Sequence, residues 1–268
     1  MGIKCEYVHY EDQLAYLALP EYCPSGLPAV VVIHDLTGLN NYCEDVTRRI
    51  AAAGYAALAP DLFAVGGGRP VPLSQDRIDD ALTFLSGLPP SARSDPQARE
   101  AEIAKLNEPN RTHIVETTRH LFAFAAPSGL DRSLHALKSA VRYLRCERPE
   151  TLGQKVACMG EELSLRLASE EPDLSGAVVF YASPPAAAKV TEIRCPLMAF
   201  YGANDPRAGQ TAAGFAEAMR LAGKSFEYHV YEGAGRGFFC DTKANYFDVR
   251  ASRDAFARLL MFLLKTLA

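Results

Sequence analysis

The stretch Lys155-Val-Ala-Cys-Met-Gly-Glu-Glu-Leu-Ser-Leu-Arg-Leu-Ala168 decides how this chain folds. Val156–Met159 is a short apolar run of the kind that forms a buried strand. Gly160 then allows a sharp turn, and the remainder indicates a helix. In an open α/β sheet, a turn at the carboxyl end of a strand is where ligands bind.

Other apolar runs indicate further strands, and amphipathic segments indicate helices between them. The expected strands are 3–10 and 13–19, which we predict to form a hairpin, and then 29–33, 55–59, 177–181, 197–201 and 226–231. The expected helices are 43–53, 74–86, 97–106, 111–125, 131–145, 209–222 and 249–267. Strands that alternate with helices predict a mostly parallel α/β sheet flanked by helices on both faces.

Residues 64–128 interrupt this alternation with a polar, proline-containing stretch and at least two helices. Long connections of this kind are often functional, so we predict a helical cap over the sheet. No segment of the chain has the composition of a linker. We therefore predict one domain over residues 1–268, with the cap as an insertion within it.

Composition excludes several classes of function. The formal net charge is −4 with mixed signs, and no basic block predicts binding to nucleic acid or to a membrane. Seven scattered cysteines include no C-x-x-C pair, so we expect reduced thiols, no metal and no cofactor. The first residues include no apolar signal region, which predicts a cytoplasmic protein.

Four stretches together resemble the dienelactone hydrolase family of α/β-hydrolases. Val30–Asn40 is similar to the family's first core strand and acidic loop, and Gly54–Phe63 to its next strand. Lys155–Ala168 resembles the elbow that carries the nucleophile in the pattern G-x-[Ser/Cys]-x-G. Tyr201–Asp205 and Tyr231–Phe239 resemble the strand ends that bear the acid and the histidine. The resemblance implies an α/β-hydrolase fold for most of the chain.

The family's catalytic residues carry over only in part. Asp205 matches the acid that orients the histidine, and Asp35 falls where the family has an additional glutamate. Glu162 falls on the nucleophile and Arg236 on the histidine, while Ser164 replaces the second glycine of the elbow. The resemblance therefore implies that one member of the triad survives.

Arginine cannot replace the catalytic histidine, because its pKa stays above about 12. His34 follows the first core strand, and we expect a structural role for it rather than that of a replacement base. His113 and His120 could descend from the cap, but surface or packing roles are the simpler interpretation. Cys158 precedes the turn and is expected to be buried, and Cys240 is expected to pack near the site.

Glu162, Arg236 and Asp205 are best considered together, because the family fold would bring them within reach of each other. One interpretation is a buried Glu162–Arg236 ion pair that fills the old site, with Asp205 also bonding the guanidinium. The other is a site in which Arg236 holds a substrate anion while Glu162 or Asp35 acts as general acid and base. These two interpretations stay open at the level of sequence.

Backbone groups and aromatic residues complete the predicted site. In the family's elbow, the N–H after the nucleophile stabilises an oxyanion, and the resemblance assigns this role to Leu163 with Leu36 as its partner. We expect His34, Tyr181 and Tyr201, which lie at or near strand ends, to contact a ligand.

Three hypotheses for function follow. The first is an enzyme that acts on a small, anionic or carbonyl-rich molecule by proton transfer, as in isomerisation, cyclisation or elimination, or by water attack without an acyl-enzyme. The second is a non-catalytic descendant that binds a ligand or a protein partner. The third is a conventional ester or lactone hydrolase that uses a base not yet identified. The sequence leaves the oligomeric state undecided.

Overall fold

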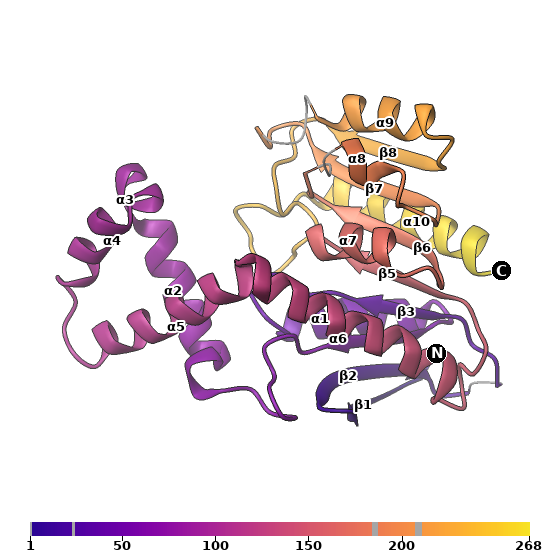
Figure 1. The fold of residues 1–268 in the computed structure, drawn as a ribbon, viewed down its shortest axis with the longest axis horizontal. Helices are drawn as coiled ribbons and strands as arrows, with labels where there is room; N and C mark the ends of the chain where they lie inside the picture. Colours follow the sequence, from indigo (N-terminus) through magenta and orange to yellow (C-terminus); the bar gives the residue numbers. More distant parts are fainter. Residues whose placement is uncertain (1, 23–24, 184–186, 207–210) are drawn as a thin grey trace.

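One sheet of eight strands organises the computed structural model, which describes residues 2–22, 25–183, 187–206 and 211–268 (Figure 1). The order of strands across the sheet is β1-β2-β4-β3-β5-β6-β7-β8. The strands are β1 (Ile3–Tyr10), β2 (Gln13–Pro20), β3 (Ala29–Val32), β4 (Ala56–Pro60), β5 (Val156–Gly160), β6 (Leu174–Phe180), β7 (Leu197–Gly202) and β8 (Phe226–Tyr231).

The first two strands form the predicted hairpin and the rest of the sheet is parallel. β1 pairs antiparallel with β2, which pairs antiparallel with β4. From β4 through β3, β5, β6 and β7 to β8, every neighbouring pair is parallel. The carboxyl ends of these six parallel strands therefore meet at one edge of the sheet, and this edge is where the residues of the predicted site converge.

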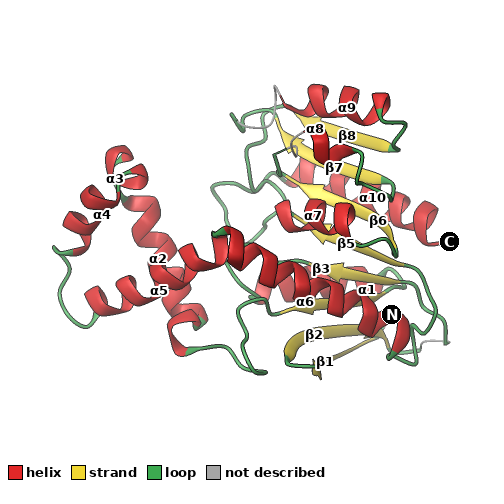
Figure 2. Ribbon diagram, viewed as in Figure 1, coloured by secondary structure: helices red, strands yellow, loops and turns green. Residues whose placement is uncertain are grey.

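Helices cover both faces of the sheet (Figure 2). Side chains of successive strand residues point to opposite faces, so Val31 belongs to one core cluster while Val30 and Val32 belong to the other. The first cluster packs beneath α6 (Pro127–Cys146), α7 (Glu162–Glu170) and α9 (Thr211–Leu221). The second packs beneath α1 (Asn41–Ala52) and α10 (Val249–Leu267), and a short α8 (Ala187–Val190) precedes β7.

Residues between β4 and α6 form a helical lobe rather than a lid that closes over the strand ends. The lobe contains α2 (Gln75–Gly87), α3 (Pro90–Ser94), α4 (Pro96–Ile103) and α5 (Asn110–Ala125), after a 3-10 turn at Val71–Leu73. Figure 1 shows these helices projecting beyond the ends of the strands and away from the sheet. The insertion is where the sequence predicts it, but most of it extends outwards.

The element bounds differ from the expected ones at a few points. α6 begins at Pro127 and not at Asp131, because proline suits the first turn of a helix and apolar Leu130 packs against the core. The expected helix at 97–106 is α4, which ends earlier, at Ile103. A further helix that was not expected, α3, precedes it, and Asp95 between them caps α4 by accepting from the Gln97 N–H. The first residues of the expected helix at 209–222 lie outside the described residues. No helix in the described part of the chain has both the length and the apolar composition needed to cross a bilayer.

Candidate active site

A cavity of about 350 Å³ opens at the carboxyl ends of the central strands. Its polar lining includes Asp35 after β3, Glu161 after β5 and Arg236 after β8. Much of the rest of its lining is apolar and belongs to the core cluster on the α1 face of the sheet. The apolar side chains that line it include those of Val32, Val46, Met159, Phe180 and Phe239. The volume lies near the lower end of the range of about 300–1,000 Å³ that is typical of ligand pockets.

The turn after β5 forms as the sequence predicts, with Gly160 as its pivot. A Cβ at Gly160 would lie 2.8 Å from the Ile33 Cβ and 3.0 Å from the Ile33 carbonyl oxygen. Only glycine fits this close approach between β3 and β5. Glu161 follows as the N-cap of α7, with φ of −97°, and its side chain lines the cavity.

The structure corrects the role expected for Glu162. Glu162 is the first residue of α7, and its side chain is 62% exposed. Its carboxylate accepts a hydrogen bond of 3.3 Å from Arg166, one helical turn further on. The predicted Glu162–Arg236 pair is therefore wrong. The turn and the start of the helix aim Glu161 at the cavity and Glu162 at solvent.

Arg236 pairs with Glu161 instead. Its Nη2 donates to Glu161 Oε2, and its Nη1 donates to the Tyr181 carbonyl oxygen at 2.8 Å. Asp205 Oδ2 lies 3.8 Å from Nη1, so the predicted proximity of Arg236 and Asp205 is confirmed. The Asp205 side chain is 2% exposed, whereas those of Glu161 and Arg236 are 28% and 34% exposed. One guanidinium thus lies between a buried carboxylate and a half-buried one.

Tyr181 supports this arrangement from the end of β6. Its φ of 56° lies in the left-handed region, which is uncommon for a residue with a bulky side chain. The hydroxyl accepts the Phe239 N–H at 2.8 Å, and burial raises the pKa of this phenol well above its usual range. The Arg236 guanidinium also lies over the ring, 5.9 Å from its centroid. Tyr181 lines the cavity, in agreement with its predicted place at the site.

Asp35 lies at the start of the loop after β3 and faces the cavity. Its Oδ1 accepts both the Thr37 N–H at 2.8 Å and the Thr37 hydroxyl at 2.5 Å. No cation among the described residues pairs with Asp35. Its carboxylate is therefore oriented by two donors on one oxygen.

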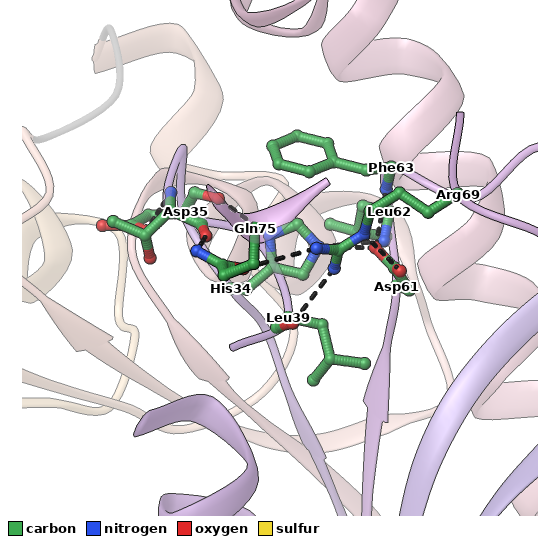
Figure 3. A network of polar contacts seen from close by, with 9 residues as sticks. His34, Asp35, Leu39, Asp61, Leu62, Phe63, Arg69 and Gln75 are labelled. Atoms are coloured by element: carbon green, nitrogen blue, oxygen red, sulfur yellow. Dashed lines mark hydrogen bonds and ion pairs between the residues drawn. The ribbon is translucent and has the colours of Figure 1, made fainter. Parts of the chain in front are cut away.

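His34 has a structural role. Its Nε2 accepts the Leu62 N–H at 2.9 Å, so its Nδ1 must carry the proton that is shared with the Asp35 carbonyl oxygen at 2.8 Å (Figure 3). Burial lowers the pKa of His34, although the Asp35 carbonyl and the Asp61 carboxylate act in the opposite direction. His34 lines the cavity, but both of its ring nitrogens are used, so it cannot act as a base there without giving up one of these bonds.

Two other histidines lie on α5 of the lobe and away from this cavity. His120 lines a separate hollow at the base of the lobe, and its Nδ1 bonds the Glu116 carbonyl oxygen at 2.8 Å. His113 lines neither hollow. Neither residue descends to the strand ends, so neither supplies a base at this cavity.

Other predicted residues are placed as follows. Leu163 is buried in α7 and Leu36 is 38% exposed, and neither is among the residues that line the cavity. Oxyanion binding by their backbone N–H groups stays a prediction. Tyr201 is 1% exposed in the core beneath α9, which corrects its expected contact with a ligand. Cys158 is buried beside Ser164, and burial raises the pKa of its thiol well above its usual range. Cys240 does line the cavity.

Some lining residues had no signal in the sequence that would have identified them. Tyr42 and Cys43 on α1 and Lys243 and Tyr246 before α10 reach the cavity only through the tertiary fold. Glu161 could have been considered from the sequence, because it is adjacent to Glu162. A shift of one residue at a strand-to-helix turn changes which of the two carboxylates faces inwards. Among the described residues, no cluster of three His, Cys, Asp or Glu side chains is suited to bind a metal.

The chain is similar to known proteins along most of its length. The model of the dienelactone hydrolase family matches residues 14–267. A protein of Saccharolobus solfataricus named "Putative carboxymethylenebutenolidase" is 28% identical over 250 residues, covering 93% of this chain and 92% of the relative. A protein of the same name from Escherichia coli (strain K12) is 25% identical over 261 residues, covering 93% of this chain and 81% of the relative.

Solved structures agree on the fold. The crystal structure of a dienelactone-hydrolase-like promiscuous phosphotriesterase from metagenomic libraries superposes with a TM-score of 0.68 at 18% identity, covering 99% of each chain. At this level of identity the likeness concerns the architecture alone. The family match and the parallel sheet described above agree with this architecture. The chain belongs to the dienelactone hydrolase family and has the α/β-hydrolase fold.

Proposed function

We propose that this protein is an enzyme that acts on a small molecule with an anionic or carbonyl head and an apolar body, without forming an acyl-enzyme. The observation that carries the proposal is the cavity at the strand ends, where Arg236 and the oriented carboxylate of Asp35 line an otherwise largely apolar space. If an internal ion pair simply filled a site that was no longer used, we would not expect a cavity of this volume.

Arg236 is the anchor for the head of the substrate. A guanidinium carries five N–H donors, and among the described residues Arg236 uses two of them in hydrogen bonds to Tyr181 and Glu161. The remaining donors suit a carboxylate or an enolate oxygen. Arg236 keeps its charge at any physiological pH, so it stabilises negative charge without exchanging a proton.

The apolar body of the substrate fits the deeper part of the cavity. Val46, Met159 and Phe180 line it, and burying apolar surface there contributes about 25 cal/mol per Å². The charged groups come from the loops that follow β3, β5 and β8. A molecule with one charged end would therefore be oriented by the cavity before any chemistry occurs.

Asp35 is the general base in this proposal. It takes a proton from the carbon beside a carbonyl, and the electron pair of the broken C–H bond moves onto the carbonyl oxygen, where Arg236 holds the enolate. Asp35 then returns the proton to another carbon of the substrate, which completes an isomerisation. In the hydrolytic variant, Asp35 takes the proton from a water molecule whose oxygen attacks the ester or lactone carbonyl, and returns it to the leaving alkoxide.

The elbow argues against an acyl-enzyme. Glu161 and Glu162 occupy the turn where the family carries serine or cysteine, and His34 has both ring nitrogens committed. A serine or cysteine mechanism depends on a base that accepts a proton and later returns it. Among the described residues, the cavity contains no other histidine.

A second candidate is a binding protein without turnover, and the Glu161–Arg236 pair favours it. This pair already satisfies part of the guanidinium, as expected if the site had lost its chemistry and been stabilised by an internal ion pair. Conventional hydrolysis of esters or lactones through an unidentified base is the third candidate. The names of the relatives favour carboxymethylenebutenolide as one compound to test.

The test combines a binding probe with a search for turnover. Benzoate is a carboxylate with a small apolar body, and we expect it to shift NMR signals of residues around the cavity. Arg236→Met should weaken benzoate binding about tenfold or more, which corresponds to about 1.4 kcal/mol. Glu162→Gln is the control, because it removes a neighbouring carboxylate that faces solvent, and it should bind benzoate like the wild type.

Turnover is then followed with lactones, esters and enolisable 2-oxo acids, and by deuterium incorporation from D2O. Asp35→Asn should abolish it, while Glu162→Gln should retain it. Binding without any turnover would favour the second candidate. Labelling of the protein by a serine- or thiol-directed covalent inhibitor that blocks turnover would favour the third. A cytoplasmic location and the absence of nucleic-acid and membrane partners stay predictions.

A further inference from the structure

Two side chains that do not line the cavity, those of Arg69 and Gln75, hold the loop that carries Asp35 through its backbone. Arg69 Nη2 donates to the Leu39 carbonyl oxygen at 3.0 Å, and Gln75 Nε2 donates to the Thr37 carbonyl oxygen at 3.1 Å. Arg69 Nη1 also donates to Gln75 Oε1 at 3.3 Å, so the two side chains brace each other (Figure 3). Both lie between β4 and the body of the lobe.

A buried carboxylate fixes this pair of side chains in place. Asp61 directly follows β4, and its side chain is 4% exposed. One of its oxygens accepts from Arg69 Nε at 2.9 Å and the other from the Phe63 N–H at 3.1 Å. The Arg69 side chain is 16% exposed, so little water competes for its donors. Arg69 therefore spans from the end of one strand to the loop after the neighbouring strand.

We propose that Arg69 and Gln75 are positioning residues for Asp35. The inference rests on the proposed function, in which Asp35 is the base. Neither side chain touches the cavity, and their effect passes through the backbone of residues 37–39. We name Asp61, Arg69 and Gln75 the loop clamp.

The path from the loop clamp to the carboxylate is short. The N–H and hydroxyl of Thr37 orient Asp35 Oδ1, and the loop clamp holds the Thr37 carbonyl oxygen on the other side of the same residue. Gly38 follows with φ of +76°, and a Cβ there would lie 3.0 Å from the Phe63 ring. The backbone around Thr37 is thus fixed by hydrogen bonds and by packing. Without the loop clamp, Thr37 can turn and Asp35 loses both donors.

The same contacts link the lobe to Asp35. Gln75 is the first residue of α2, so the Thr37 carbonyl oxygen is bonded directly to the start of the lobe. The Leu62 N–H donates to the ring of His34, which adds a second connection between the segment after β4 and the loop after β3. The sequence singled out the lobe as functional, and the loop clamp is the point at which it meets the proposed site.

The experiment reads the hydrogen bond between Thr37 and Asp35 directly by NMR. An amide proton bonded to a carboxylate shifts when that carboxylate ionises, so the Thr37 amide signal is followed as pH is lowered. Arg69→Lys keeps a cation opposite buried Asp61 but cannot reach all three acceptors. Gln75→Leu leaves the Asp61–Arg69 pair intact, and it tests the loop clamp even if the first variant does not fold.

Arg77→Lys is the matched control. Arg77 has the same 16% exposure as Arg69 and pairs with Glu116 at 3.0 Å within the lobe. We expect the wild type and Arg77→Lys to show the full pH-dependent shift of the Thr37 amide. Arg69→Lys and Gln75→Leu should lose most of this shift, while signals from the core stay in place.

An unchanged shift of the Thr37 amide in Gln75→Leu and in folded Arg69→Lys would overturn the proposal. An equal loss in Arg77→Lys would also overturn it, because the effect would then not belong to the loop clamp. This readout requires no turnover. If Asp35→Asn leaves catalysis intact, the proposed function fails while the structural effect of the loop clamp remains measurable.

Discussion

Arg236 forms its ion pair with Glu161, and the adjacent Glu162 faces solvent beside Arg166. Glu162 and Arg236, which the resemblance places at the nucleophile and histidine positions, thus do not pair with each other. The acid position is filled by Asp205, which lies 3.8 Å from the guanidinium. The charge of Arg236 is therefore balanced by two carboxylates, and one of them, Glu161, was not identified by the resemblance.

The two adjacent glutamates should differ in their effect on stability. Glu161→Gln removes the charge of a half-buried ion pair and should lower the free energy of unfolding by about 1 kcal/mol. Glu162→Gln removes an exposed pair on α7 and should change it by less than about 0.5 kcal/mol. Urea denaturation at neutral pH measures both. A larger loss in Glu162→Gln would contradict the orientation of the turn.

His34 should make stability depend on pH. Burial lowers the pKa of His34 in the folded protein, so below its unfolded value of about 6.5 the unfolded chain binds more protons. The stabilisation by neutral His34 is complete above about pH 6.5 and is lost as pH falls below it, with a slope of at most about 1.4 kcal/mol per pH unit.

The measurement compares the wild type with His34→Gln by urea denaturation between about pH 7.5 and about pH 5, a range that brackets the unfolded pKa. Glutamine keeps a donor and an acceptor but does not titrate there. The variant should be less stable at pH 7.5, and the difference should shrink as pH falls. Parallel stability curves for the two proteins would show that His34 is not held neutral.

Gly160 should not tolerate a side chain. Gly160→Ala places a Cβ 2.8 Å from the Ile33 Cβ, and overpacking of this kind should cost about 1–3 kcal/mol. Gly214→Ala is the control, because Gly214 lies in α9 and a Cβ there would meet no described atom within 4 Å beyond its chain neighbours and the backbone of its own helix. That change should stabilise the protein by up to about 1 kcal/mol, since alanine favours helix. Thermal unfolding of the two variants should therefore shift in opposite directions.

The Tyr181 hydroxyl should stabilise the segment that carries Arg236. Tyr181→Phe leaves the Phe239 N–H in a buried position without its acceptor, at a cost of about 1–3 kcal/mol. Tyr231→Phe removes a hydroxyl whose acceptor, Asp254, lies near the surface, and should cost less than about 1 kcal/mol. Hydrogen exchange at Phe239 should accelerate in Tyr181→Phe alone. Equal protection of Phe239 in both variants would contradict this role.

Much of the fold follows from short patterns along the chain. The apolar runs predict the five strands β3, β4, β5, β6 and β7 close to their observed positions, because a strand buried on both faces needs an uninterrupted apolar sequence. Gly160 identifies the turn because only glycine permits the contact with Ile33. The start of α6 is less well predicted, since Asp131 is a plausible cap and Pro127 is equally compatible with a helix start.

The sequence by itself determined the sheet and the turn at Gly160, because these depend on residue type and local spacing. Tertiary structure alone decided that Glu161 faces Arg236, since successive residues at a strand-to-helix turn point in different directions. It also decided that Arg69 and Gln75 reach the Asp35 loop. Such contacts depend on how the segment between β4 and the lobe packs against the loop after β3. The separation of these residues along the chain carries no information about that packing.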